Sequence, residues 1–297
     1  MIDKLIGYWK PLLAVIFWGA SFIATKIALN ELSPMAIILL RLVFAIVLLV
    51  LFSLYKKESF TLKPRIHGWI FILALVAVFH LWIQVTGLKY TSASNTGWIV
   101  GLSPVFMAIL GILFFKEFLR LIQTFGILIA FLGLVLLISK ADFSNLNFIS
   151  NKGDFMVLAS SFTWSLYSII NKRIAIDYSP MLTTLFLFVF MALLISPFVI
   201  NSAVVLAILH LSLRSWISIV FLGIFCSGIA YVLWAQSLKE MESAKVGAFL
   251  YFEPFITVFT AWLFLKEVIT PLMLLSGFII TLGVVLVNSK KLSLKRS

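Results

Sequence analysis

The chain has 297 residues, of which 63% are apolar and only 11% are charged. Soluble domains are about 45–50% apolar and about 25% charged, so this composition excludes a soluble globular protein and indicates repeated membrane spans. The net charge of +12 would suggest nucleic acid in a soluble protein. Here the lysines and arginines gather in loops and tails, where they orient membrane spans, so no nucleic-acid partner is expected.

Cysteine and histidine usage narrows the chemistry. The single cysteine, Cys226, lies inside an apolar run, which excludes an intramolecular disulfide and a cysteine metal cluster. The three histidines, His67, His80 and His210, are too dispersed for a metal-binding motif. The sequence also has no nucleotide-binding loop, and its loops are too short to hold clustered catalytic acids. No metal, no cofactor and no enzymatic activity are therefore expected.

Apolar runs between polar breaks predict ten membrane helices in an all-α integral membrane protein. They cover residues 11–29, 35–54, 67–87, 95–115, 121–138, 153–172, 180–200, 214–237, 245–265 and 271–288. The first run follows Lys4 and Lys10, as in a signal peptide, but nine further runs indicate that it remains as a membrane helix. Short connections predict a bundle of antiparallel neighbours. Gly126, Ala130 and Gly133 give the fifth span a small-residue face suited to tight helix contact.

The distribution of positive charge predicts the orientation. Sixteen lysines and arginines fall on the side that holds both chain ends, and six fall on the other side. Cytoplasmic loops carry an excess of these residues. We therefore expect a multi-pass protein of the cell membrane with cytoplasmic N- and C-termini.

The sequence also repeats itself. Residues 95–120 match residues 245–270 at a constant shift of 150 positions, and the early spans match later ones at a shift of 146, as in Trp18 and Trp164. In this alignment Pro104 pairs with Pro254.

The repeat predicts two domains of five spans each, residues 1–139 and 153–297, joined by a polar linker at 140–152. Because each half holds an odd number of spans, the halves face opposite ways. Such inverted repeats are common in secondary transporters.

Several short motifs complete a family pattern. They are Trp18-Gly19 in the first span, Leu40-Arg41-Leu42 in the second, Ser103-Pro104 in the fourth, Glu253-Pro254 in the ninth, and Lys-Glu after the fourth and ninth. With the two five-span halves, they resemble the EamA family of the drug/metabolite transporter superfamily over essentially the whole chain. The resemblance implies a transporter of amino acids or other small metabolites, often outward. It also implies a central cavity lined mainly by spans 1, 3, 4, 6, 8 and 9.

Glu253 is the only acid clearly inside a predicted span. A charge at that depth costs roughly 2.5–3.5 kcal/mol on insertion scales, so a carboxyl retained there indicates function. Glu253 is predicted to bind a substrate amine or to couple transport to protons. The alternative is a hydrogen-bonded structural carboxyl at the helix break made by Pro254.

Two predicted spans carry matching polar stripes, the first at Trp18, Ser21, Phe22 and Thr25 and the sixth at Trp164, Tyr167, Ser168 and Asn171. Residues three, four and seven apart share one face of a helix. The tryptophan, tyrosine and asparagine members are predicted to bind substrate, because large polar-tipped groups fit badly against lipid. Packing between helices is the alternative, above all for Ser21 and Thr25.

Three other spans add substrate-binding candidates. His80 and Gln84 stand one turn apart in the third span, where they contact a substrate or proton or, alternatively, cross-link helices. Tyr231 in the eighth span and Tyr251 in the ninth are predicted to line the cavity. Trp98 in the fourth span is predicted to do so too, with a membrane-surface anchor as the alternative.

The remaining candidates have gating or structural roles. Arg41, Pro104 and Pro254 are predicted to be such residues, although Arg41 could also snorkel to the surface, pair with a carboxylate or carbonyl, or contact substrate. Lys116-Glu117 and Lys266-Glu267 stand at hairpin ends, where they are expected to cap helices.

The sequence as a whole predicts a secondary transporter that works by alternating access around a mid-membrane cavity. Export of amino acids, including aromatic or apolar ones, is the favoured activity. Amines, nucleosides or organic anions, import or exchange, and a passive channel stay open as alternatives. The expected partners are a small-molecule substrate and the lipid bilayer, and a homodimer is compatible with the sequence.

Overall fold

The computed structural model describes residues 8–61, 64–115, 121–139, 152–175, 179–200, 202–241 and 246–288. Residues 140–151 of the predicted linker and the pair Lys116-Glu117 lie outside these ranges. Within them the chain is almost entirely helical and forms no strand.

The described residues of the first half form six helices, which are α2 (Trp9–Ala28), α3 (Pro34–Tyr55), α4 (Pro64–Tyr90), α5 (Ala93–Val100), α6 (Ser103–Phe115) and α7 (Leu121–Ser139). The predicted fourth span is therefore divided into α5 and α6 by a turn at Gly101-Leu102.

The second half begins with α8 (Lys152–Ala175), α9 (Pro180–Val199) and the short α10 (Ser202–Leu209). The predicted eighth span is one rod in three parts, which are α11 (Leu213–Phe221), the π-helix η2 (Leu222–Ile229) and α12 (Ala230–Glu240). The predicted ninth span consists of the 3₁₀-helix η3 (Ala248–Phe252), α14 (Glu253–Thr260) and the π-helix η4 (Ala261–Leu265), and α15 (Pro271–Asn288) follows.

Five of these rods are long and apolar enough to cross a bilayer by length and composition. They are Trp9–Ala28, Pro34–Tyr55, Ile66–Tyr90, Pro180–Val199 and Leu213–Glu240. Shorter apolar helices cover Leu121–Leu137, Phe249–Leu265 and Pro271–Leu286. The prediction of an all-helical membrane protein agrees with these lengths.

Local sequence explains where several helices start. Ser33 caps α3 by accepting a hydrogen bond from the backbone N–H of Ala36, 3.3 Å away, and Pro34 follows in the first turn. Proline is favoured there because its missing N–H would have no helical partner. Ser92 caps α5 and Ser212 caps α11 in the same way.

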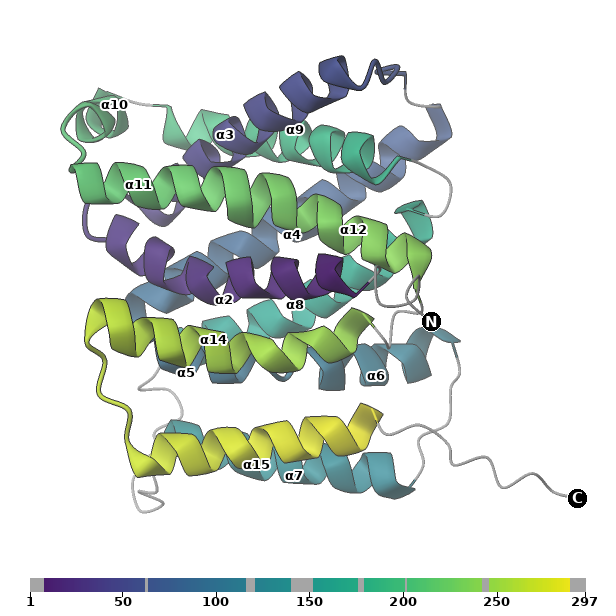
Figure 1. Ribbon diagram of the computed structural model, residues 1–297, viewed down its shortest axis with the longest axis vertical. Helices are drawn as coiled ribbons and strands as arrows, with labels where there is room; N and C mark the ends of the chain where they lie inside the picture. The colour runs from purple at the N-terminus through teal and green to yellow at the C-terminus, as the bar shows by residue number, and fades with distance from the viewer. Residues whose placement is uncertain are drawn as a thin grey trace, which may run out of the picture.

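The helices pack as a bundle in which α7 and α15 form a separate pair along one side (Figure 1). This pair is tight because glycines meet the neighbouring backbone. A Cβ atom at Gly133 would lie 2.8 Å from the backbone N of Ile280, and one at Gly283 would lie 2.3 Å from that of Ala130. The small-residue face predicted for residues 126–133 thus packs against a helix.

Contacts between helices occur in matched pairs. The α4–α8 contact has a counterpart in the packing of α11 and α12 against α2, and the α6–α8 contact has one in α14–α2. Likewise, α4–α9 corresponds to α3–η2, while α3 packs on α9 and α7 on α15. These contacts are thus repeated with the two halves of the chain exchanged, whereas the contact of α15 with α6 has no equally close counterpart among the described helices.

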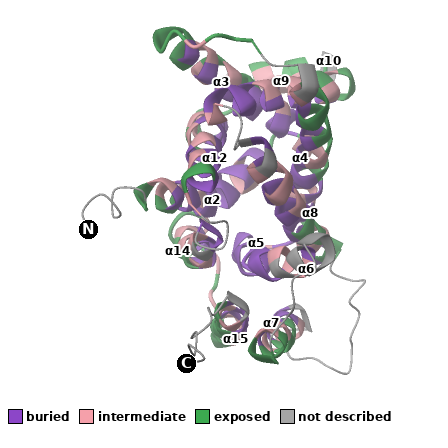
Figure 2. Ribbon diagram, turned by 90° about the vertical axis from the view of Figure 1, so that its right-hand side faces the viewer, coloured by how far each residue is buried: buried purple, intermediate pink, exposed green. Residues whose placement is uncertain are grey.

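Both described ends of the chain lie at one end of the bundle, which we call the terminal end (Figure 1). The connections after α2, α4 and α10 and the one before α15 lie at the opposite end, the distal end. Figure 2 shows buried residues gathered where the inner helices face one another and exposed ones along the outer faces of α3 and α7.

Candidate functional site

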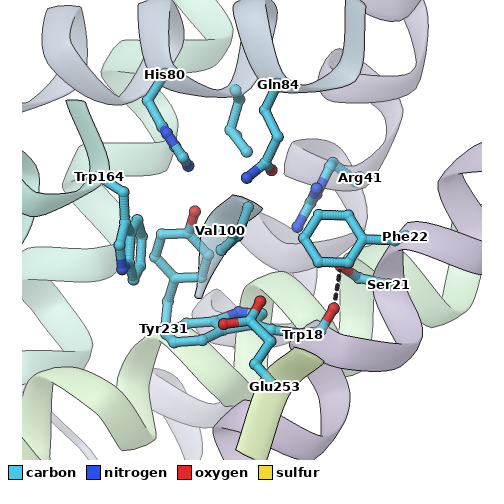
Figure 3. Close-up of a pocket in the computed structure, with 11 residues that line it drawn as sticks. Trp18, Ser21, Phe22, Arg41, His80, Gln84, Val100, Trp164, Tyr231 and Glu253 are labelled. Carbon is cyan, nitrogen blue, oxygen red and sulfur yellow. Dashed lines mark hydrogen bonds between the residues drawn. The ribbon is translucent and has the colours of Figure 1, made fainter. Parts of the chain in front are cut away.

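A small cavity lies in the middle of the bundle between helices of both halves (Figure 3). Its walls are formed by Trp18, Ser21, Phe22, Arg41, His80, Leu81, Gln84, Val100, Trp164, Tyr231 and Glu253. The free space is about 30 Å³. A single water needs about 10–15 Å³ on such a measure, whereas binding pockets for small molecules run to roughly 300 Å³ or more. The structure therefore shows the cavity closed.

The cavity lies where two helical rods are interrupted. The α5 helix ends at Val100, and α14 begins at Glu253, so both residues stand at helix ends. Glycines allow these rods to touch, since a Cβ atom at Gly97 would lie 2.7 Å from Cβ of Thr257 and one at Gly101 would lie 2.9 Å from Cγ of Pro254. This contact brings the Glu253 carboxylate to the cavity wall (Figure 3).

Arg41 and Glu253 enter the cavity from different walls (Figure 3). Each side chain is only 4% exposed. Nε of Arg41 donates a hydrogen bond to Oγ of Ser227 over 2.8 Å. Among the described residues, no carboxylate lies within ion-pair distance of Arg41. No group of these residues donates a hydrogen bond to the Glu253 carboxyl group. A buried guanidinium and a buried carboxyl group thus face the same space without forming a pair.

Aromatic rings close the cavity toward the terminal end. Trp18 meets Trp164 edge to face at a centroid distance of 5.0 Å, and it meets Tyr231 at 5.6 Å. Trp234 lies 5.1 Å from Trp18, and Tyr167 stacks on Trp164 at 5.0 Å. Such ring pairs add roughly 0.5–1.5 kcal/mol each beyond the area that they bury.

His80 connects α4 to α8 as well as lining the cavity. Its Nδ1 lies 3.0 Å from the carbonyl oxygen of Ser160, which can only accept, so Nδ1 carries the proton. Gln84, one turn further along α4, directs its amide into the cavity (Figure 3). The structure thus shows a helix cross-link at His80 made with a backbone carbonyl of α8.

Six of the ten predicted substrate-binding residues line the closed cavity, namely Trp18, His80, Gln84, Trp164, Tyr231 and Glu253. Arg41, predicted as a gating or structural residue, lines it too. Pro104 and Pro254 lie in the first turns of α6 and α14, where each starts a helix.

The structure places Trp98 and Tyr251 away from the cavity. Trp98 is 2% exposed, which rules out a membrane-surface anchor, and its ring lies 5.3 Å from that of Phe255. A Cβ atom at Gly277 of α15 would lie 2.4 Å from this indole, so a glycine makes room for it. Tyr251 donates its hydroxyl to the carbonyl of Val284, also in α15, over 3.1 Å. Both side chains attach α15 to the bundle.

Tyr167 and Asn171 lie behind the cavity wall. Asn171 Nδ2 donates a hydrogen bond to the Tyr167 hydroxyl over 3.3 Å, and Tyr167 supports Trp164 by stacking on it. They support the residues that line the cavity.

Sequence reasoning missed Ser227, Leu81 and Val100. Leu81 and Val100 are apolar residues within apolar runs, so nothing in the sequence marks them. Ser227 lies in η2, where the π-helical turn changes the register that a regular helix would have. A serine in an apolar run was the only signal available for it.

At the distal end, two carboxylates reach across from one half of the chain to the other. Glu267 accepts hydrogen bonds from the backbone N–H groups of Ala93 and Ser94 at 2.9 and 3.1 Å and from the Ser94 hydroxyl at 2.7 Å. Glu31 accepts hydrogen bonds from the N–H and hydroxyl of Ser212 and from the hydroxyl of Ser215. The predicted capping role of Glu267 agrees with this geometry.

The terminal end has its own contacts between the halves. Lys10 and Glu240 form an ion pair at 2.5 Å, and Ser179 donates its hydroxyl to the Glu58 carboxylate over 3.0 Å. Both ends of the bundle are therefore bridged from one half to the other.

Comparisons with known proteins agree with this architecture. The profile of the EamA-like transporter family matches residues 5–139 and 151–289. A protein of Archaeoglobus fulgidus described as a transporter is 29% identical over 285 residues, which cover 94% of this chain and 96% of that protein. The Bacillus subtilis transporter YyaM is 27% identical over 82% of this chain and 81% of its own. A crystal structure 18% identical covers 94% of this chain and 95% of its own with a TM-score of 0.68, which indicates the same fold.

Proposed function

Because the chain belongs to the EamA-like transporter family, we propose that it is a secondary transporter that exports amino acids, preferably those with aromatic or apolar side chains. The transported molecule is a zwitterion held in the central cavity. The protein is a multi-pass membrane transporter.

One observation carries the choice of substrate. Arg41 and Glu253 face the same cavity from different walls and have no charged partner of opposite sign among the described residues. Buried charges are stable only when they are paired or hydrogen-bonded. An amino acid supplies both partners, its carboxylate for the Arg41 guanidinium and its ammonium for the Glu253 carboxylate.

The need to pair both buried charges disfavours the other small-molecule classes. An amine would leave the Arg41 guanidinium unmatched in a closed cavity, and an organic anion would leave the Glu253 carboxylate unmatched unless it takes up a proton. The edges of Trp18, Trp164 and Tyr231 offer an apolar, polarisable wall for the substrate side chain.

The proposed mechanism is alternating access between two inverted repeats, residues 1–139 and 153–297. The matched contacts of the two halves support this, since exchanging the halves reproduces most of the main helix contacts. The cavity is too small for a substrate, and both ends are bridged, as expected of a closed intermediate between two open states. A passive channel would instead keep a continuous polar path.

Orientation and coupling complete the proposal. In the sequence, the side predicted to hold both chain ends carries the excess of lysines and arginines, which supports cytoplasmic N- and C-termini in the cell membrane. Glu253 has no hydrogen-bond donor on its carboxylate among the described residues, so it is free to exchange a proton for a substrate ammonium. Outward export then uses the proton gradient.

Counterflow in proteoliposomes tests the substrate class. Vesicles that hold purified protein and unlabelled phenylalanine are given labelled phenylalanine, labelled phenethylamine or labelled phenylpropionate. We expect saturable exchange of phenylalanine and at least tenfold slower exchange of the two analogues that lack one charge. Equal exchange of phenethylamine would overturn the zwitterion assignment, and rapid unsaturable flux of all three would indicate a channel.

A further inference from the structure

We propose that Ser227 is a positioning residue that orients Arg41 for the substrate carboxylate. This inference rests on the proposed function and adds to it a residue that does not line the cavity. The observation behind it is the 2.8 Å hydrogen bond from Nε of Arg41 to Oγ of Ser227. Both side chains are buried, with 4% of Arg41 and 1% of Ser227 exposed.

The bond determines which part of the guanidinium remains for substrate. A guanidinium is planar and has donors on Nε, Nη1 and Nη2. When Nε is held by Ser227, the plane of the group is fixed and the two terminal nitrogens remain free. Two parallel N–H donors match the two oxygens of a carboxylate, and this fork geometry is the basis of strong arginine–carboxylate recognition.

The π-helix η2 brings Ser227 to this place. Its glycines allow close approach to α3, because a Cβ atom at Gly223 would lie 2.4 Å from Cβ of Phe44 and 3.0 Å from the carbonyl oxygen of Arg41. One at Gly228 would lie 2.7 Å from a methyl carbon of Leu48. The rod that carries Ser227 is thus pressed against the turn of α3 that carries Arg41.

The neighbouring residue in η2 holds a second cavity side chain. The indole Nε1 of Trp18 donates to the carbonyl oxygen of Cys226 over 3.0 Å, and the Cys226 thiol donates to the carbonyl of Phe17. Consecutive residues of η2 therefore orient the cavity's arginine and one of its tryptophans. Wide π-helical turns occur rarely and often at functional sites, which fits a positioning role for this segment.

Ser227→Ala tests the proposal, with Ser237→Ala as the matched control. Ser237 is also a buried serine of the same rod, but its hydroxyl bonds only to the carbonyl of Leu233 on its own helix. We expect S227A to raise the KM for phenylalanine counterflow about tenfold, as expected for the loss of a hydrogen bond to a charged group. In S227A, the maximal rate and the weak exchange of phenethylamine should change little. The S237A variant should keep the wild-type KM, and Ser227→Thr should restore it.

A spectroscopic measurement tests the positioning independently of any substrate. In protein labelled with ¹⁵N-arginine, the Nε–H signal of Arg41 is assigned by its loss in Arg41→Lys. Its proton should exchange with water several-fold faster in S227A than in the wild type and in S237A.

The outcomes separate the two ideas. Unchanged exchange of the Nε–H proton, or an equal rise in KM for phenylalanine and phenethylamine, would overturn the positioning role of Ser227. If wild-type vesicles exchange no amino acid while S227A still frees the Arg41 proton, the proposed substrate is wrong and the Arg41–Ser227 positioning stands.

Discussion

The Glu267 carboxylate binds Ser94, 173 positions earlier in the sequence, through both the backbone N–H and the hydroxyl of that serine. Glu31 makes the equivalent contact with Ser212 in the opposite sense, from the first half of the chain to the second. A helix N-terminus leaves its first N–H groups without partners, and a carboxylate satisfies them while complementing the helix dipole. These two carboxylates therefore link the halves at the distal end, and we call them the distal latches.

Removing both latches should open the cavity toward the distal end. In the double variant Glu31→Gln/Glu267→Gln, charge-assisted hydrogen bonds become weaker neutral ones, so both contacts between the halves are weakened. A cysteine placed at Phe22, in a background with Cys226→Ala, should react at least tenfold faster with a thiol reagent added on the distal side.

The matched control is Glu58→Gln at the terminal end, where Glu58 bonds to Ser179. It should not raise distal labelling. If the double variant labels no faster than the background, the two carboxylates cap helices without gating the cavity.

Glu253→Gln should distinguish coupling to protons from exchange of substrate. The amide has the shape of the carboxyl group but cannot take up or release a proton. We expect uphill transport driven by a proton gradient to be lost, while counterflow of phenylalanine persists with a raised KM because an amide binds an ammonium group less strongly. Unchanged uphill transport in E253Q would remove the coupling role of this residue.

Alanine variants of Trp164 and Tyr167 should distinguish substrate binding from packing between helices. Trp164 lines the cavity, whereas Tyr167 stacks behind it. Replacing a buried aromatic residue by Ala costs about 3–5 kcal/mol, so Trp164→Ala and Tyr167→Ala should both lower the melting temperature. At temperatures where both variants stay folded, only Trp164→Ala should raise the KM for phenylalanine more than fivefold. Equal KM values for the two variants would place Trp164 among packing residues.

Glu31 should make the stability depend on acid pH. Hydrogen bonds from the hydroxyls of Ser212 and Ser215 lower the pKa of Glu31 below its ordinary value of 4.5. A lowered pKa in the folded state means that the stabilisation is present above the unfolded value and is lost as the pH falls through the folded one. The difference in melting temperature between wild type and Glu31→Gln should thus be constant above pH 5 and shrink below about pH 4. A difference that does not change with pH would show that these bonds do not require the charge.

Local features of the sequence determined the helices. Apolar length locates the rods, because the bilayer offers no partner for an unpaired backbone group. Ser33-Pro34 and Ser179-Pro180 start α3 and α9 as their types predict. The repeat and the short motifs also sufficed for the family, which the profile match over both halves confirms.

Spacing along one helix indicates which residues share a face, but it does not tell what that face meets. Trp98 and Tyr251 are aromatic residues on membrane helices like Trp18 and Trp164, yet the packing of α15 takes up their side chains. The sequence alone could not distinguish Trp98 and Tyr251 from the cavity tryptophans, because their surroundings depend on how α15 packs, and α15 comes later in the chain.

The changes of helix type within the rods could not be predicted from the sequence either. The turn of η2 brings Ser227 to Arg41, 186 positions away. Arg41, predicted to be a gating or structural residue, faces the same cavity as Glu253. Apolar composition and charge counts determined that this chain is a bundle of membrane helices. Only the tertiary structure decided which buried charges share one space, because that depends on close contacts between helices far apart in the sequence.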